Sequence, residues 1–239
     1  MASKIRLHVA QPPQEGQTLR LTPEQAHYLF GVMRKGTGEV VEVFDGRSGG
    51  WDAEVVEAGK KKGALRVMAQ VRPQRDPPDL WLLFAPIKRA RTDFIVEKAA
   101  EMGAARICPV QTDFTNSERI RRDRLQAHAV EAAEQCGGTF VPEVAEIEKL
   151  GALLDHWSED RRLMFCDEGL AGAGAVLPGD AGPWAVLIGP EGGFSEGERS
   201  RLAALPQAHA VSLGPRILRA DTAAVAALTL WQTTLGDWA

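Results

Sequence analysis

The sequence of 239 residues predicts an α/β protein with two domains: a C-terminal α/β domain, built on a mainly parallel sheet with helices on both faces, and a small N-terminal β-barrel. Three observations predict this arrangement. Short strand-like segments separated by turn residues fill the first part of the chain, apolar strands alternate with helical segments in the remainder, and a proline-rich break lies between the two parts. The chain is long enough to bury a core in each domain.

The break covers residues 72–79, which contain three prolines and four charged side chains. This composition continues neither a strand nor a helix, so we expect a linker. The predicted boundaries follow: a first domain at residues 1–72, a linker at 73–79 and a second domain at 80–239.

The predicted elements can be stated by residue range. The N-terminal domain has strands at 5–9, 39–44, 51–57 and 64–71, and a helix that opens at the N-cap Thr22 followed by Pro23. The C-terminal domain has strands at 80–85, 106–110, 163–166, 184–188 and 208–213, and helices at 92–102, at 123–135, after Ser195 and at 222–235. The last helix is apolar on nearly every face, so it must pack against the core or a second subunit.

Composition excludes several classes of protein. Hydrophobic residues make up 44% of the chain and charged residues 25%, as in a soluble globular protein, and no apolar run is long enough for a membrane helix. The basic N-terminus lacks the apolar stretch of a signal peptide, which predicts a cytoplasmic protein. Three widely spaced cysteines predict no disulfide framework, and the chain has no Cys-x-x-Cys or His-x-x-x-His pair, so we expect no metal site.

The net charge of −4 is unevenly divided. Residues 1–124 contain 21 Lys/Arg and 16 Asp/Glu, a balance of +5, whereas residues 125–239 contain 7 and 16, a balance of −9. A partner rich in phosphates would be attracted to the first half only. On charge alone, a solvated surface explains the excess equally well.

Two glycine-bearing bends near the C-terminus carry the sharpest functional signal. The first, LIGPEGGF at residues 187–194, and the second, LGPRILRADT at residues 213–222, each follow an apolar strand and break at Gly-Pro. Bends at the ends of adjacent strands would form a crevice lined by backbone N–H and C=O groups. The polar side chains at this crevice are Glu191, Ser212, Arg216, Arg219, Asp221 and Thr222. Two arginines beside a carboxylate suit a substrate that is anionic or that develops negative charge during the reaction. The glycines of one such bend, taken alone, would indicate only a tight turn.

The chain carries no phosphate-binding loop, dinucleotide fingerprint or serine nucleophile elbow. Instead, the two bends resemble the hallmark motifs of the SPOUT superfamily of methyltransferases, whose C-terminal chain is threaded into a trefoil knot. More narrowly, the chain resembles the RsmE family, bacterial enzymes that methylate N3 of a uridine in 16S ribosomal RNA. Arg6 and residues 32–34, 44–46 and 52–54 look like the family's N-terminal PUA-like domain, and residues 97–104, 131–137 and 141–143 resemble its central signatures.

Two positions depart from the family pattern. Gly138 stands where arginine is usual, and Asp221 stands where glutamate is commoner, which keeps the carboxylate but shortens its reach by one methylene.

The resemblance implies a site and a methyl donor, S-adenosylmethionine, bound bent in the crevice. The residues that would bind it are Leu187, Ile188, Gly189, Pro190, Glu191, Gly192, Gly193, Ser212, Leu213, Gly214, Ile217, Leu218, Arg219 and Ala220. Arg216 and Arg219 would stabilise negative charge on the uracil oxygens, and Asp221 or Glu191 would take the N3 proton. For Asp221, an ion pair with a neighbouring arginine is an equally good interpretation. A homodimer packed through the knot is also implied.

Positive residues in the first half would bind the implied partner, 16S ribosomal RNA of the small ribosomal subunit. They are Arg6, Arg34, Lys35, Lys88, Arg89, Arg91, Arg119, Arg121 and Arg122, with Arg124 beside the last cluster. Two other functions stay open at this point: a SPOUT enzyme that methylates a ribose 2′-hydroxyl of transfer RNA, and a non-catalytic RNA-binding assembly factor.

Overall fold

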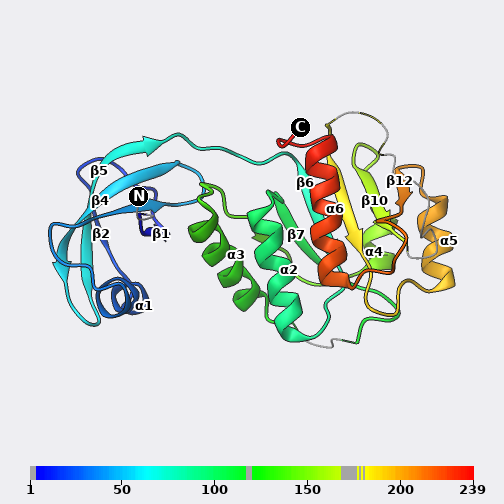
Figure 1. Cartoon of the computed structure of the whole chain (residues 1–239), viewed down its shortest axis with the longest axis horizontal. Helices are drawn as coiled ribbons and strands as arrows, with labels where there is room; N and C mark the ends of the chain where they lie inside the picture. Colours follow the sequence, from blue (N-terminus) through cyan, green and yellow to red (C-terminus); the bar gives the residue numbers. More distant parts are fainter. Residues whose placement is uncertain (1–3, 117–119, 168–176, 178, 180) are drawn as a thin grey trace. The chain divides into compact units, whose positions relative to one another are not determined.

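The computed structural model describes residues 4–116, 120–167, 177, 179 and 181–239. Contacts divide the chain into two compact units (Figure 1). The first is Met1–Asp76 together with Ala133–Val141, and the second is Pro77–Ala132 together with Pro142–Ala239. Among the described residues, no helix has the length and apolar character needed to cross a membrane.

The first unit is a curled sheet with the strand order β1-β3-β4-β5-β2. Its strands are β1 (Arg6–His8), β2 (Thr18–Arg20), β3 (Val40–Phe44), β4 (Gly50–Ala58) and β5 (Gly63–Arg72). Strands β1 and β3 are parallel and the other pairs are antiparallel. Alternate side chains of these strands, including Val41, Val43, Val55, Leu65 and Val67, point to one side and form the core.

A short helical segment completes the first unit. Helix α1 (Pro23–Ala26) begins with the predicted cap, in which the Thr22 hydroxyl accepts a bond from the Gln25 amide and the Gln25 side chain accepts one from the Thr22 amide. It continues as the π-helix η1 (His27–Val32), which the sequence pattern did not predict. Leu29 of this segment is fully buried in the core of the sheet.

The second unit contains a parallel sheet with the strand order β12-β10-β11-β6-β7-β8, and β9 pairs with β7. Its strands are β6 (Leu80–Phe84), β7 (Arg106–Gln111), β8 (Glu143–Val144), β9 (Glu148–Lys149), β10 (Arg162–Cys166), β11 (Trp184–Ile188) and β12 (Ala208–Val211). The helices are α2 (Arg89–Glu101), α3 (Arg122–Cys136), α4 (Leu150–Asp155), α5 (Glu196–Ala204) and α6 (Ala220–Thr234).

Helices cover both faces of this sheet, and the alternation of strand residues shows how. On β11, Trp184, Val186 and Ile188 pack with side chains of α2, α3 and α6. Ala185 and Leu187 point to the other face, where they pack with side chains of α4 and α5. Every residue of β11 is buried, as expected of a central strand in a parallel sheet. Helices α2 and α6 lie side by side on the first face (Figure 1).

The predicted linker lies between two strands, because β5 ends at Arg72 and β6 begins at Leu80. Residues 133–141, which include the last turn of α3, belong to the first unit by their contacts. That residues 1–72 and residues 80–239 form the two functional domains stays a prediction.

Candidate active site

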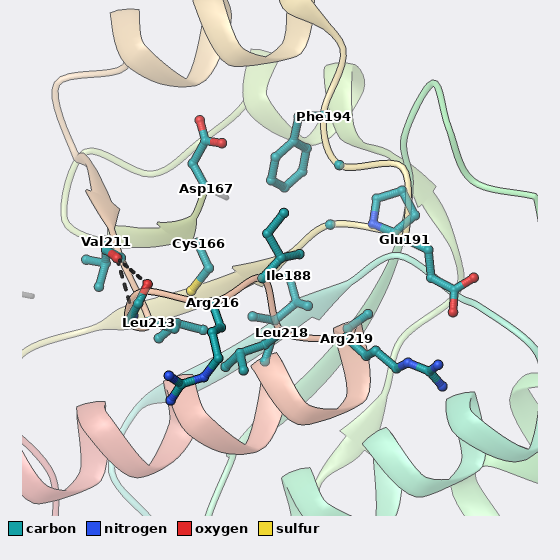
Figure 2. Close-up of a pocket in the computed structure, with 18 of the residues that line it drawn as sticks. Cys166, Asp167, Ile188, Glu191, Phe194, Val211, Leu213, Arg216, Leu218 and Arg219 are labelled. Atoms are coloured by element: carbon teal, nitrogen blue, oxygen red, sulfur yellow. Dashed lines mark hydrogen bonds between the residues drawn. The ribbon is translucent and has the colours of Figure 1, made fainter. Parts of the chain in front are cut away.

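A pocket of about 550 Å³ lies at the carboxyl edge of the parallel sheet (Figure 2). The ends of β10, β11 and β12 and the start of α6 form its walls. The carboxyl end of an open parallel sheet, where the strand order reverses direction, is the usual ligand site of such folds. The volume falls within the range of about 300–1,000 Å³ that small-molecule sites span.

The first predicted bend forms one wall of the pocket. Ile188, Gly189, Pro190 and Gly193 line it, and the buried ring of Phe194 covers Gly189. A β-carbon added at Gly189 would lie 3.1 Å from that ring, so a larger residue here would require the ring to shift.

The second predicted bend forms the opposite wall. Strand β12 ends at Val211, two residues before its predicted end, because the Ser212 hydroxyl and the backbone of Gly214 bond each other at 3.3 Å and turn the chain. The apolar side chains of Leu213 and Leu218 face the pocket beside Ile188 (Figure 2). The two bends therefore meet in one cavity.

Arg91 links the two bends electrostatically. Its guanidinium pairs with the carboxylate of Glu191 on the first bend, and its Nε lies 2.9 Å from the carboxylate of Asp221 on α6. The side chains of Arg91 and Asp221 are about four-fifths buried, whereas that of Glu191 is 54% exposed. These contacts favour the interpretation of Asp221 as an ion-pair partner, and they occupy the guanidinium of Arg91, which the sequence assigned to RNA.

Arg216 and Arg219 are exposed at the pocket, and among the described residues neither forms an ion pair. Their side chains extend in different directions, and that of Arg219 extends to the side of the pocket where Glu191 lies (Figure 2). Each therefore presents a cationic fork of donors to the cavity or its mouth.

Most of the predicted cofactor residues line the pocket. They are Ile188, Gly189, Pro190, Glu191, Gly193, Ser212, Leu213, Gly214, Ile217, Leu218, Arg219 and Ala220. Leu187 and Gly192 are not among the lining residues, because the Leu187 side chain is buried in the face toward α4 and α5 and Gly192 packs against Phe114.

Several other lining residues were not predicted as site residues, among them Cys166, Asp167, Phe194 and Arg199. Asp167 follows β10 directly, and a guanidinium nitrogen of Arg199 lies 3.3 Å from its carboxylate. The signal for Asp167 was its position immediately after a buried strand, whose carboxyl end must share the edge of the parallel sheet with the two bends.

Comparisons with known proteins agree with this geometry. The model of an RNA methyltransferase domain matches residues 74–232, and that of an RNA methyltransferase PUA domain matches residues 21–68. The ribosomal RNA small subunit methyltransferase E of Synechocystis sp. is 32% identical to this chain, covering 88% of it and 71% of the relative. The chain belongs to the RsmE family of RNA methyltransferases.

Similarity to other RsmE proteins extends over nearly the full length. The Rickettsia conorii protein is 26% identical, with 93% of each chain covered. The crystal structure of the Neisseria gonorrhoeae protein, bound to S-adenosyl methionine, matches with a TM-score of 0.88 at 26% identity, covering 99% of this chain and all of that one. The second unit thus has the predicted SPOUT fold and the first the predicted PUA-like fold. Whether the chain is threaded as a knot stays a prediction.

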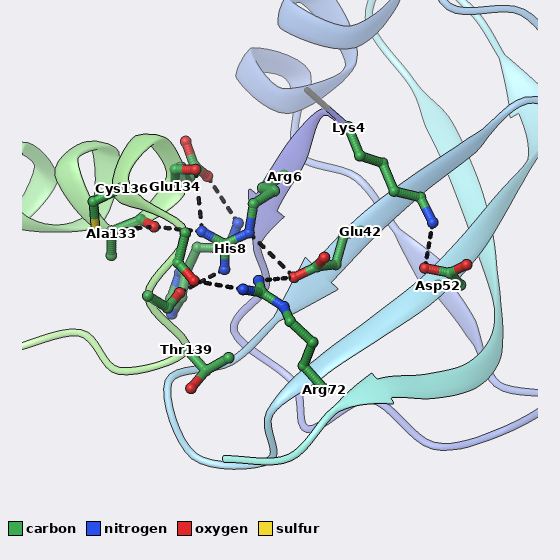
Figure 3. A network of polar contacts seen from close by, with 12 residues as sticks. Lys4, Arg6, His8, Glu42, Asp52, Arg72, Ala133, Glu134, Cys136 and Thr139 are labelled. Atoms are coloured by element: carbon green, nitrogen blue, oxygen red, sulfur yellow. Dashed lines mark hydrogen bonds and ion pairs between the residues drawn. The ribbon is translucent and has the colours of Figure 1, made fainter. Parts of the chain in front are cut away.

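The expectation that Arg6 of this RsmE protein binds RNA needs correction. Its side chain is only 8% exposed and stacks on the ring of Phe44. Its Nε lies 3.1 Å from Glu42 (Figure 3). Its two terminal nitrogens donate to the carbonyls of Ala133, Glu134 and Gly138. Since each nitrogen has an acceptor, Arg6 has no face left for a phosphate.

The other side chains predicted to bind RNA differ in whether they are free to contact a phosphate. Arg34, Lys88 and Arg89 are exposed, and among the described residues none of them forms an ion pair. Lys35 pairs with Glu39, Arg121 pairs with Asp123, and Arg122 donates to the carbonyl of Val144. Arg119 lies outside the described residues.

Gly138, the departure from the family pattern, contributes its carbonyl to Arg6. A β-carbon added there would lie 3.4 Å from the Cys136 sulfur, an ordinary contact, so the backbone at this position does not require glycine.

The cysteines give an expectation that can be checked by alkylation. Burial raises the pKa of Cys166 to about 12 and that of Cys108 to about 11, whereas Cys136 is exposed. Because the thiolate is the reactive form, the two shifted thiols stay protonated until the pH approaches these values. At pH 8, iodoacetamide is expected to label Cys136 first, as measured by peptide mass spectrometry. Equal labelling of Cys166 in folded protein would contradict this, and unfolded protein provides the control.

Proposed function

We propose that this protein transfers a methyl group from S-adenosylmethionine to N3 of a uridine in 16S ribosomal RNA of the small ribosomal subunit. The observation that supports this most is the single cavity in which the two bends meet beside Arg216 and Arg219, neither of which has an ion-pair partner among the described residues. Relatives over nearly the full length are named ribosomal RNA small subunit methyltransferases, and one is crystallised with the donor.

The residues present fit this donor. The apolar side chains of Ile188, Leu213 and Leu218 would hold the adenine ring, and the backbone of the bends would bond its polar edge. The carboxylate of Asp167 offers acceptors for the donor's hydroxyl or ammonium groups. The half-buried thiol of Cys166 adds a soft, neutral surface to the same wall.

The chemistry requires a deprotonated N3. When bound, the donor supplies a methyl group on a cationic sulfur, so that an N3–C bond forms as the S–C bond breaks. The N3 proton must leave to a base, and negative charge then spreads to O2 and O4. Arg219, with Arg216, would stabilise that charge without changing its own protonation state.

Glu191 is the better placed of the two predicted bases. Both carboxylates pair with Arg91, but Glu191 lines the pocket and is 54% exposed, whereas Asp221 is largely buried and does not line it. We therefore assign Glu191 as the group that accepts the proton, directly or through water, and Asp221 as the group that positions Arg91.

The partner would be attracted by the exposed cations Arg34, Lys88 and Arg89. RNA affinity is expected to fall with a log–log salt slope of about −0.7 per phosphate contact if the contacted RNA is single-stranded. Replacing Arg89 with alanine should reduce the magnitude of the slope by about one such contact. The matched control is Lys62→Ala, since Lys62 is 85% exposed and is not one of the candidate cations. A flat salt response of the wild-type protein would contradict the electrostatic role.

The dimer and the cellular location are further parts of this proposal. Val225 and Leu230 of α6 are only partly buried, and Ile217 beside the pocket is 72% exposed. A second copy packed on this surface would cover these side chains. Light scattering is expected to give a mass of twice 25.9 kDa. We place the protein in the cytoplasm, where its RNA substrate is found.

Nucleoside analysis of ribosomal RNA tests the function. In cells that lack this protein, 16S RNA is expected to lose one N3-methyluridine, and purified protein with donor should restore it on small subunits from those cells. A missing 2′-O-methyl nucleoside in transfer RNA would instead support a different SPOUT enzyme. Unchanged nucleosides together with no donor binding would support a non-catalytic assembly factor.

A further inference from the structure

A second, smaller hollow of about 270 Å³ adjoins the candidate donor pocket. It shares Lys88, Pro190 and Glu191 with that pocket, and it adds Arg89, Phe114 and Asn116. Its volume lies just below the range of about 300–1,000 Å³ for drug-sized ligands, which suits a flat group the size of a nucleobase. The proposed chemistry leaves this hollow unused.

Phe114 gives the hollow an aromatic surface. The side chain lies just after β7 and is 46% exposed, although a ring of this size is usually buried. Exposed aromatic rings beside cations are the means by which proteins stack on unpaired bases.

The loop that carries Phe114 is held in place before any ligand binds. The backbone N–H of Thr112 donates to the Thr115 hydroxyl at 2.8 Å, and the Thr115 N–H donates to the Thr112 carbonyl at 3.1 Å. The Asp113 N–H donates to Glu198 at 2.9 Å, and the Asp113 carboxylate accepts from Ser195, so the loop is tied to the N-terminus of α5. A ring positioned in this way loses little freedom when a base stacks on it.

The first bend packs directly against this ring. A β-carbon added at Gly192 would lie 3.3 Å from the β-carbon of Phe114, which is tighter than an ordinary contact. Gly192 thus lets the bend that lines the donor pocket touch the aromatic residue of the second hollow. This adjacency gives a reason for the second glycine of the motif, which does not line the donor pocket itself.

We propose that the second hollow holds the uracil ring of the target uridine, stacked on Phe114, with Lys88 donating to its O4 and Asn116 donating to its O2. This inference rests on the proposed function. N3 lies between those two oxygens and would face the wall shared with the donor pocket, where Glu191 and Lys88 lie and to whose Glu191 side Arg219 extends (Figure 2). The nucleotide must be turned out of the RNA to enter, as for other enzymes that act on a base.

The same contacts would select uracil over cytosine. The lysine ammonium is a donor only, and cytosine presents an amino group where uracil presents O4. A cytosine in the hollow would leave two donors facing each other, which is how a site built for one base rejects another. Arg89, at the rim, would contact a neighbouring phosphate.

The test is Phe114→Ala, assayed on small subunits that lack the modification. Loss of the ring on which the base stacks is expected to lower kcat/KM by about 5- to 140-fold, equivalent to about 1–3 kcal/mol. Phe114→Tyr should restore most of the rate, because it keeps the ring. Donor affinity by calorimetry should be unchanged, since Phe114 does not line the donor pocket. The matched control is Phe94→Ala, an aromatic residue on α2 that is 39% exposed and outside both hollows.

A second readout is independent of activity: RNA containing 5-iodouridine at the modified position should cross-link on irradiation to the peptide that contains Phe114. A Phe114→Ala rate within twofold of wild type, a loss of donor binding in that variant, or a cross-link to another aromatic residue would each overturn the inference. If the wild-type protein does not methylate uridine at all, the proposed function fails instead.

Discussion

Replacing Arg219 with alanine is expected to lower methyl transfer by about 10²–10³-fold while donor binding is retained. The reason is that a donor aimed at charge developing in the transition state contributes to the rate and little to binding of the ground state. Arg219 is exposed at the pocket, on the side where Glu191 lies, and among the described residues it forms no ion pair (Figure 2). Calorimetry with the donor and a tritium-methyl assay measure the two properties separately.

Arg201→Ala is the matched control, since Arg201 on α5 pairs with Asp155 and does not line the pocket. If Arg219→Ala leaves both donor binding and transfer unaffected, the proposed role is wrong. Arg216→Ala and the double variant extend the test. The two side chains extend in different directions. The free-energy effects of the two substitutions should therefore be closer to additive than those of two residues that act on one atom.

Replacing Arg6 with alanine is expected to destabilise the first unit by about 3 kcal/mol, the lower end of the range for breaking a buried ion pair. Arg6 satisfies the carbonyls of Ala133, Glu134 and Gly138 at the end of α3 (Figure 3). Those carbonyls, which lie at the negative end of the helix dipole, would lose their donor. Arg72, which also pairs with Glu42, would remain to neutralise that carboxylate.

Hydrogen exchange localises this effect, and it is preferable to a single unfolding midpoint because the chain has two units. Protection should fall in peptides from residues 1–76 and 133–141 and stay unchanged in α6. Lys4→Ala is the control: Lys4 and Asp52 form an exposed pair, worth at most about 1 kcal/mol. If Arg6→Ala has the exchange pattern of wild type and weakens RNA binding instead, Arg6 is an RNA contact after all.

Sequence patterns located the elements whose signal is local. Strand β11 has its predicted range, because burial on both faces requires a continuous apolar run. Helix α2 begins at Arg89, three residues before the predicted start, because its first turn carries Arg89 and Arg91, which add nothing to an apolar pattern. The π-helix at His27–Val32 has no sequence pattern of its own that periodicity could reveal.

The residues of the candidate site also fall into two groups, those that the sequence predicted and those that only the fold brings together. Gly-Pro breaks after apolar strands are visible along the chain, so both bends were predicted together with most of the residues that line the pocket. Asp167, Phe114 and the partners of Arg91 were not predicted, because each depends on segments far apart in the sequence that meet only at the edge of the sheet.

The sequence alone therefore determined the fold class, the family and the two bends that line the pocket, because hydrophobic periodicity and glycine-containing bends are properties of neighbouring residues. Only the tertiary structure decided which charges are available for function. Arg6 and Arg91 look the same as Arg89 and Arg219 in the sequence, yet the first two are held by carboxylates. Whether a guanidinium is paired depends on which distant acceptors the fold brings within hydrogen-bond distance, and local sequence does not encode that.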